Sequence, residues 1–155
     1  MVFLTVFTPA YNRASTLPRT YESLCDQECK EFIWLIVDDG STDETASLVK
    51  EWQKKENGFE IQYIYKKNGG MHTAHNVAYE NIHTELNVCI DSDDRMAKGA
   101  VKKIKTAWLK VRNKNYAGLI GLDADMNTGR IIGKDFSYGL KETTLGGYYA
   151  SGGEG

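Results

Sequence analysis

Apolar residues follow two alternating patterns along the chain. Short runs that are apolar at successive positions, and rich in β-branched and aromatic residues, indicate strands buried on both faces. They occupy residues 2–7, 32–37, 59–65 and 86–90. Between them, apolar residues recur every three or four positions, as on one buried helix face; these segments are residues 15–28, 46–52, 74–82 and 98–114. This order predicts right-handed βαβ crossovers and an α/β fold, with a mostly parallel sheet and helices on both faces.

Two further elements are expected near the end of the chain. Residues 116–122 (YAGLIGL) have the composition of a fifth strand. Residues 130–138 are expected to pair as a hairpin, through the turn-forming residues 125–129. The last residues, 145–155, are rich in glycine. We therefore expect a single domain over residues 1–155 that is incomplete at its C-terminus, with Glu154-Gly155 a tag remnant.

Composition narrows the class of protein. The chain has 155 residues, 41% of them hydrophobic, which is enough to bury a core. Its formal net charge of −2 argues against general binding to nucleic acid. The cysteines Cys25, Cys29 and Cys89 lack the spacing of a disulfide framework and fit a reducing, cytoplasmic compartment. No apolar run approaches the roughly 18 residues of a membrane span.

Polar, glycine-bearing and acidic segments follow the four predicted strands. They are TPAYNR (8–13), DDGSTD (38–43), KKNGGMHTAHN (66–76) and DSDD (91–94). Ligands of open parallel sheets bind beyond the carboxyl ends of the strands. The four segments are therefore predicted to form one site.

The segment DSDD carries the strongest local signal. Asp91, Asp93 and Asp94 would repel one another unless a cation neutralises them, and a divalent metal is the usual solution. Mg²⁺ or Mn²⁺ prefers one or two carboxylates together with the phosphate oxygens of a ligand. Asp91 and Asp93 are two positions apart, so in an extended stretch they face the same way. The simpler alternative is a solvated turn in which Asp94 caps the next helix.

The segment DDGSTD also allows two interpretations. A carboxylate of Asp38 or Asp39 at a strand end can accept hydrogen bonds from a ribose or a base N–H. Alternatively, both are ordinary turn aspartates, with Ser41, Thr42 or Asp43 capping the following helix.

In the third segment, Gly69 and Gly70 can present backbone N–H groups to an anion at a helix start, beside Lys66 and Lys67. The segment follows neither the GxxxxGK[ST] nor the GxGxxG pattern. His72 and His75 share a helical face, but no third ligand at metal-site spacing follows, so structural histidines or substrate contacts are favoured.

Two other segments have simpler explanations. Residues 123–129 (DADMNTG) differ from a calcium loop because the glycine falls one place late and Lys134 stands where a glutamate is needed. Residues 98–114 contain seven basic residues and no acidic one. Such a segment can bind an anionic membrane surface, which would place the protein at the inner face of the plasma membrane. The simpler interpretation is the solvated outer face of a helix.

In this order, TPAYNR, VDDGSTD, NGGMHTAHN and DSDD resemble the nucleotide-sugar-binding half of inverting family-2 glycosyltransferases of the GT-A fold. The resemblance covers residues 2–122. It implies nucleotide-sugar-binding βα units over residues 1–122 and the start of an acceptor-side region over 123–155. It also implies transfer of a hexose-type sugar from a nucleoside diphosphate donor, with UDP expected, to a saccharide or lipid-linked acceptor in cell-surface polysaccharide synthesis.

The resemblance assigns the donor's base to the first three segments. Pro9 and Tyr11 would lie against the base, and Asp39 would accept a hydrogen bond from uracil. Asn68 and Gly69 would line the base or diphosphate region.

The same resemblance assigns the diphosphate to the fourth segment, with Mn²⁺ or Mg²⁺ as cofactor. Asp91 would contact the ribose or sugar, and Asp93 would bind the metal. Asp94 is a neighbouring candidate ligand. A metal that bridges the phosphates stabilises the charge of the leaving nucleoside diphosphate.

Two departures from the family pattern stand out. Relatives commonly have a basic residue where this chain has Met71. In such enzymes, the catalytic base that deprotonates the acceptor comes from the later half of the protein. We assign neither Asp123 nor Asp125 to that role, so the catalytic residue is unassigned.

Two alternatives to an active glycosyltransferase remain. A sugar-1-phosphate nucleotidyltransferase would have a loop rich in glycine and arginine after the first strand, which TPAYNR lacks. A donor-binding module without full activity is consistent with the unassigned base.

Overall fold

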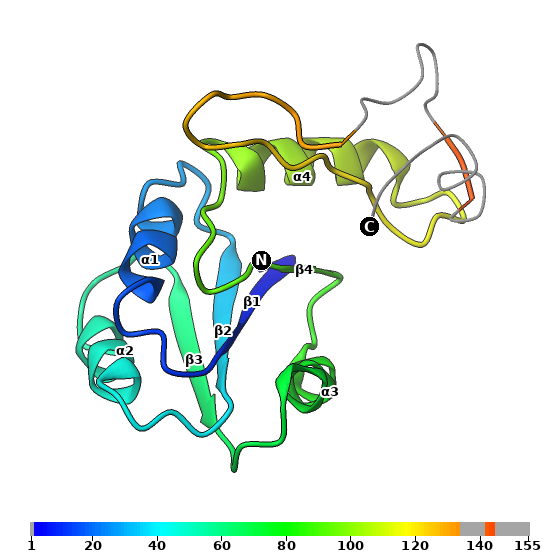
Figure 1. The fold of residues 1–155 in the computed structure, drawn as a ribbon. Helices are drawn as coiled ribbons and strands as arrows, with labels where there is room; N and C mark the ends of the chain where they lie inside the picture. Colours follow the sequence, from blue (N-terminus) through cyan, green and yellow to red (C-terminus); the bar gives the residue numbers. More distant parts are fainter. Residues whose placement is uncertain (1, 134–141, 145–155) are drawn as a thin grey trace. The chain divides into compact units, whose positions relative to one another are not determined.

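The computed structural model describes residues 2–133 and 142–144. The chain divides into two compact units, Met1–Gly118 and Leu119–Gly155. The first unit contains all the helices and strands found in the described residues (Figure 1). It also contains the four polar segments predicted to form the site.

The first unit is built on a four-stranded parallel sheet with the order β3-β2-β1-β4. Its strands are β1 (Leu4–Ala10), β2 (Phe32–Asp38), β3 (Glu60–Tyr65) and β4 (Leu86–Cys89). All four predicted strands are confirmed. Because β1 and β2 pair in register from Leu4 opposite Phe32 to Ala10 opposite Asp38, their ends reach the same edge of the sheet.

Four helices follow the strands, as predicted. They are α1 (Leu17–Cys25), α2 (Thr45–Gln53), α3 (Met71–Asn81) and α4 (Ala100–Val111). In Figure 1, α1 and α2 lie on one side of the sheet and α3 on the other. The prediction of a parallel α/β sheet covered on both faces is therefore confirmed.

Side chains of the central strands alternate between two hydrophobic cores. Trp34 and Ile36 of β2 pack in the core that includes residues of α1, α2 and α4. Leu35 and Val37 pack on the other face, against Ala74 and neighbouring residues of α3. Because successive side chains of a strand point to opposite faces, a strand buried on both sides is apolar throughout, as the sequence of β2 is.

Three aromatic rings organise the first core. Tyr21 stacks on Trp52 with ring centroids 4.4 Å apart, and Trp52 stacks on Trp34 with centroids 5.8 Å apart. The indole N–H of Trp34 donates to the hydroxyl of Thr8 at 3.0 Å. A ring from each of α1, α2 and β2 is thus fixed relative to the end of β1.

The predicted fifth strand at residues 116–122 is wrong, because these residues have no regular structure. In the described part of the second unit, the backbone pairing of β type consists of one isolated antiparallel bridge between Ala124 and Ile131. The carboxylate of Asp125 accepts the backbone N–H groups of Asn127 and Thr128, which closes the turn predicted at 125–129. The predicted hairpin strand continues at 134–138, outside the described residues.

Within the described residues, no helix has the length and apolar character needed to cross a membrane. Cys25, Cys29 and Cys89 are free thiols.

Replacing Trp34 by alanine is expected to lower the free energy of unfolding by about 3–5 kcal/mol, because it leaves a cavity between the two helices and the sheet. Urea denaturation measures the change. Tyr65→Ala is the matched control, since this aromatic side chain at the end of β3 is 59% exposed and its loss is expected to cost less than about 0.5 kcal/mol. Equal losses in the two variants would contradict the assignment of Trp34 to the core.

Candidate functional site

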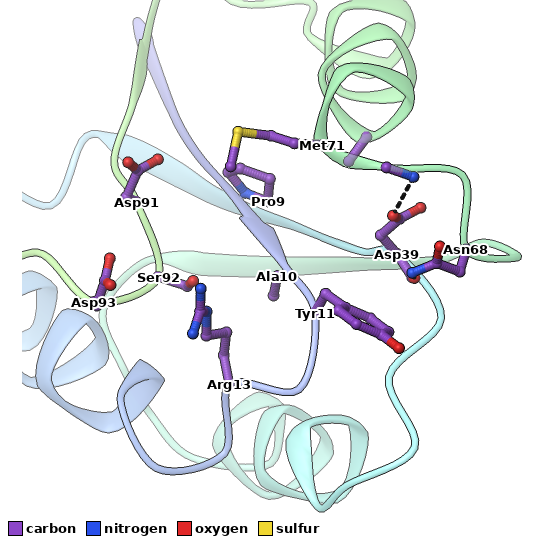
Figure 2. Close-up of a pocket in the computed structure, with 12 residues that line it drawn as sticks. Pro9, Ala10, Tyr11, Arg13, Asp39, Asn68, Met71, Asp91, Ser92 and Asp93 are labelled. Carbon is purple, nitrogen blue, oxygen red and sulfur yellow. Dashed lines mark hydrogen bonds between the residues drawn. The ribbon is translucent and has the colours of Figure 1, made fainter.

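The carboxyl ends of β1, β2 and β4 and the start of α3 surround a cavity of about 340 Å³ (Figure 2). All four polar segments contribute to it, as the topology predicted. The lining residues are Pro9, Ala10, Tyr11, Arg13, Asp39, Asn68, Gly70, Met71, Ala74, Asp91, Ser92 and Asp93.

Most of the residues predicted to bind substrate line this cavity. They are Pro9, Tyr11, Asp39, Asn68, Asp91 and Asp93. Gly69 and Asp94 are not among the lining residues. Figure 2 shows Asp91 and Asp93 on one side of the cavity and Tyr11, Asp39 and Asn68 on the other.

The first two segments are held together by hydrogen bonds around Asn12. Asn12 has a positive φ of 52°, and its side-chain carbonyl accepts the backbone N–H of Thr42 at 2.8 Å. Its own N–H donates to the hydroxyl of Ser41 at 2.8 Å. Asp43 accepts the N–H groups of Ala14 and Thr45, both at 3.0 Å. Among the predicted capping residues, Asp43 therefore serves the first turn of α2, while Ser41 and Thr42 contact the β1 loop.

The two adjacent aspartates at the end of β2 have different environments. Asp38 is fully buried and accepts hydrogen bonds from the backbone of Ser41 at 2.7 Å and from the hydroxyl of Tyr63 at 2.5 Å. Burial and this bond to Asp38 raise the pKa of Tyr63. Asp38 therefore braces the turn, and Asp39 is the one of the pair that lines the cavity.

The carboxylate of Asp39 holds the glycine loop that precedes α3. It accepts the backbone N–H of Gly69 at 3.0 Å and that of Gly70 at 2.7 Å. It also forms an ion pair with Lys66. The Asp39 carbonyl accepts the side-chain amide of Asn68 at 2.9 Å. One residue directly after β2 thus holds residues 66–70, the part of the third segment that precedes α3.

Close approach of the chain explains the glycine at position 40. Gly40 has a φ of +85°, and a Cβ atom there would lie 2.7 Å from the backbone nitrogen of Asn68. Any side chain would push the second and third segments apart.

Asp39 is only 4% exposed, and burial by itself raises the pKa of a carboxyl group. The hydrogen bonds from Lys66, Gly69 and Gly70, with the positive charge of Lys66, outweigh this effect and lower the pKa of Asp39 below its ordinary value. The carboxylate therefore stays ionised at neutral pH.

On the opposite side of the cavity, Asp91 and Asp93 are exposed while Ser92 between them is buried. This alternation agrees with the prediction that the two carboxylates face the same way. No donor in residues 2–133 or 142–144 is hydrogen-bonded to either side chain. Two unpaired carboxylates suit a divalent ion that takes its remaining ligands from phosphate and water. The described residues hold no cluster of three or more potential metal ligands.

Asp94 does not cap the next helix, contrary to the alternative drawn from the sequence. α4 begins at Ala100, and its N-cap is Gly99 with a φ of 71°. The backbone carbonyl of Asp94 instead accepts the hydroxyl of Thr20 at 2.8 Å, which ties the acidic segment to α1.

The sequence-based interpretation missed Arg13. Its guanidinium lines the cavity, extending toward the side of Ser92 and Asp93 in Figure 2. The segment TPAYNR already contained a signal for this role. Its arginine follows the first strand, and the end of that strand lies at the same edge of the sheet as the acidic segment. Met71, where relatives commonly have a basic residue, also lines the cavity and brings no charge.

The two helical histidines do not line the cavity. His75 packs against Phe7 in an edge-to-face arrangement with ring centroids 5.2 Å apart. This contact supports a structural role for His75.

Comparison with known proteins finds similarity to glycosyltransferases. The sequence matches the protein-family model for glycosyl transferase family 2 over residues 5–145. It is 31% identical, over 64% of the chain, to the putative teichuronic acid biosynthesis glycosyltransferase TuaG of Bacillus subtilis, and covers 39% of that protein. It is also 31% identical, over 59% of the chain, to an undecaprenyl-phosphate 4-deoxy-4-formamido-L-arabinose transferase of Pseudomonas fluorescens, covering 28% of it.

Solved structures show the same fold. S. aureus TarS 1–349 in complex with UDP superposes with a TM-score of 0.61 and 27% identity, over 70% of this chain and 32% of that one. The mannosyltransferase PcManGT of Pyrobaculum calidifontis gives a TM-score of 0.66 at 21% identity, over 79% of this chain and 35% of that one, which bears on the fold alone. The chain spans between 16% and 39% of the length of the curated relatives it matches.

The ion pair at Asp39 can be tested by titration. Lys66→Gln is expected to raise the pKa of Asp39, because burial remains while the compensating cation is lost. Carboxyl ¹³C NMR measures the midpoint in both proteins. In the wild type, the stability due to the lowered pKa is present above the ordinary value of about 3.9 and is lost as the pH falls through the folded-state pKa.

Lys67→Gln is the matched control, since this neighbouring lysine is exposed and its side chain forms no hydrogen bond or ion pair in the described residues. The Asp39 midpoint should not move in that variant. A midpoint that also stays fixed in Lys66→Gln would refute the proposed electrostatic balance.

Proposed function

Because the chain belongs to glycosyl transferase family 2, we propose that its cavity binds the nucleoside diphosphate part of a UDP-sugar, with Mn²⁺ or Mg²⁺. The observation that carries the proposal is the two exposed carboxylates of Asp91 and Asp93, which have no side-chain partner in the described residues and lie opposite the polar loop held by Asp39. UDP is the expected nucleotide because TarS, at 27% identity, has been solved with UDP and with UDP-GlcNAc.

The base would lie on the side of Tyr11, Asp39 and Asn68. The Tyr11 ring is 49% exposed and can stack on a base. Two donors meet Oδ1 of Asp39, but only the N–H of Gly70 meets Oδ2 among the described residues. Since a carboxylate oxygen has two lone pairs, Oδ2 can accept one further hydrogen bond, such as one from the N3–H of uracil.

The diphosphate would lie on the side of Arg13, Asp91 and Asp93. Arg13 is one cation against two unpaired carboxylates, so this side of the cavity by itself repels an anion. A divalent ion held by Asp93 and Asp91 reverses that balance and withdraws charge from the leaving diphosphate. Asp91 would also contact the ribose or sugar. Metal and nucleotide are therefore expected to bind together. Of the three candidate metal ligands, Asp94 has the least structural support, because it does not line the cavity.

The complete reaction is proposed as inverting transfer of a hexose to a saccharide or lipid-linked acceptor in cell-surface polysaccharide synthesis. In this proposal residues 1–122 bind the donor, residues 123–155 begin the acceptor side, and the free cysteines fit a cytoplasmic location. Membership of the family favours glycosyl transfer over nucleotidyl transfer. The alternative of a donor-binding module is distinguished by assaying UDP-sugar hydrolysis: a module binds the donor without releasing UDP.

Isothermal calorimetry tests the metal dependence of donor binding. UDP is expected to bind in the presence of Mn²⁺ and to bind at least tenfold more weakly after chelation. Asp93→Asn is expected to weaken Mn²⁺-dependent binding about 10- to 100-fold, since it removes a charged ligand. Asp123→Asn is the control, because this aspartate is absent from the cavity lining. Failure of the wild-type chain to bind UDP with any metal dependence would sink the donor-site proposal.

A ligand series separates the two sides of the cavity. Tyr11→Ala is expected to weaken uridine, UMP and UDP alike, by about tenfold for a lost stacking contact. Arg13→Ala is expected to leave uridine unchanged and to weaken UDP by about 10- to 100-fold, because its guanidinium faces the phosphates. Competition titrations at fixed Mn²⁺ give the ratios. Equal weakening of uridine and UDP by Arg13→Ala would contradict the assignment of Arg13 to the diphosphate side.

A further inference from the structure

We propose that the outer face of α4 docks onto an anionic lipid bilayer. This face is defined by Lys98, just before the helix, and by Lys102, Lys103, Leu109 and Lys110 on it. The proposal concerns a surface outside the donor cavity and does not depend on the identity of the nucleotide.

Positively charged residues of the chain are concentrated at and around this helix. Residues 98–114 contain seven of the 19 lysines and arginines and none of the 21 aspartates and glutamates, in a chain whose net charge is −2. Such local asymmetry is typical of a surface that meets an anionic partner.

The structure divides six of the seven cations into two groups, and the seventh, Lys114, lies over the ring of Tyr116. Lys105 and Arg112 are turned toward the body of the unit, where they form ion pairs with Glu31 and with Glu85, the latter at 3.5 Å. Lys98, Lys103 and Lys110 form no side-chain hydrogen bond or ion pair with any residue in 2–133 or 142–144. Their charges are therefore uncompensated.

Lys102 also belongs to the outer group. Its contact with Glu28 is 3.4 Å long, and the two side chains are 68% and 62% exposed. Such a solvated pair contributes little and is easily exchanged for another partner.

Helix geometry places these lysines on the side away from the core. Val101 and Trp108, seven positions apart, are buried against the sheet. Lys103 and Lys110 are also seven positions apart and are offset from Val101 and Trp108 by about 200° at 100° per residue. Lys102, Lys103 and Lys110, all exposed, therefore lie on the solvent-facing side of α4, and Lys98 is exposed just before the helix.

An apolar residue lies among these lysines. Leu109 is 52% exposed, about one turn after Thr106 and two turns after Lys102 along the same side. A leucine flanked by lysines can enter the acyl boundary of a bilayer while the ammonium groups reach the headgroups.

The same details argue against nucleic acid as the partner. The face has neither an uncompensated arginine nor an exposed aromatic ring, the groups that grip phosphates bidentately and stack on bases. A bilayer needs only the positive charge and the apolar contact that this face offers.

Vesicle co-sedimentation of the full chain tests the proposal. Binding is expected to vesicles of phosphatidylglycerol and phosphatidylcholine, and not to phosphatidylcholine alone, and it should weaken as salt rises. Each lysine near an anionic surface accounts for roughly a fivefold change in partition. The combined variant Lys102→Gln, Lys103→Gln, Lys110→Gln should therefore bind about a hundredfold more weakly.

The matched control replaces three exposed lysines of and after α2, as Lys50→Gln, Lys54→Gln, Lys55→Gln, with the same change in net charge. It should retain most binding, and far-UV circular dichroism should show both variants folded. The single change Leu109→Asn, at an exposed position, should weaken binding to vesicles several-fold and leave salt dependence unchanged.

Three results would overturn the proposal. One is absence of binding to anionic vesicles at low salt. Another is equal weakening by the α2 control, which would show that only net charge matters. The third is tighter binding to duplex DNA than to vesicles, which would identify nucleic acid as the partner.

Discussion

The arrangement of the cavity depends on one residue, Asp39, at the end of β2. Its backbone N–H donates to the carbonyl of Ala10 at 2.8 Å, and its carboxylate holds Lys66 and the N–H groups of Gly69 and Gly70. Burying a carboxylate is costly unless donors replace the lost water. Because the glycine loop supplies two of those donors, the carboxylate and the loop stabilise each other, and three of the four polar segments meet through this residue.

The sequence predicted the sheet, its helices and the gathering of the segments because these follow from periodicity and topology. Strands such as β2 are buried on both faces, so their apolar runs are unambiguous. Parallel strands bring their carboxyl ends to one edge, so Tyr11, Asp39 and Asp93 had to lie near one another. Neither inference needs knowledge of side-chain contacts.

What could not be predicted depends on tertiary contacts. Residues 116–122 have the composition of a strand, but strand formation requires a paired neighbour, and none is present in the described residues. Asp38 and Asp39 look alike in the sequence, and only the positions of Tyr63 and Lys66 separate a bracing aspartate from one that lines the cavity. The role of Arg13 likewise depends on how the β1 loop turns around Asn12.

The hydrogen bond between Trp34 and Thr8 gives the molecule a built-in optical reporter. Thr8 directly precedes Pro9 of the cavity wall, and the indole that it accepts from is stacked with Trp52. The emission of an indole responds to the polarity and hydrogen bonding around its ring. A displacement of the β1 loop that altered this hydrogen bond would therefore change the emission of Trp34, a fluorophore that is not among the residues lining the cavity.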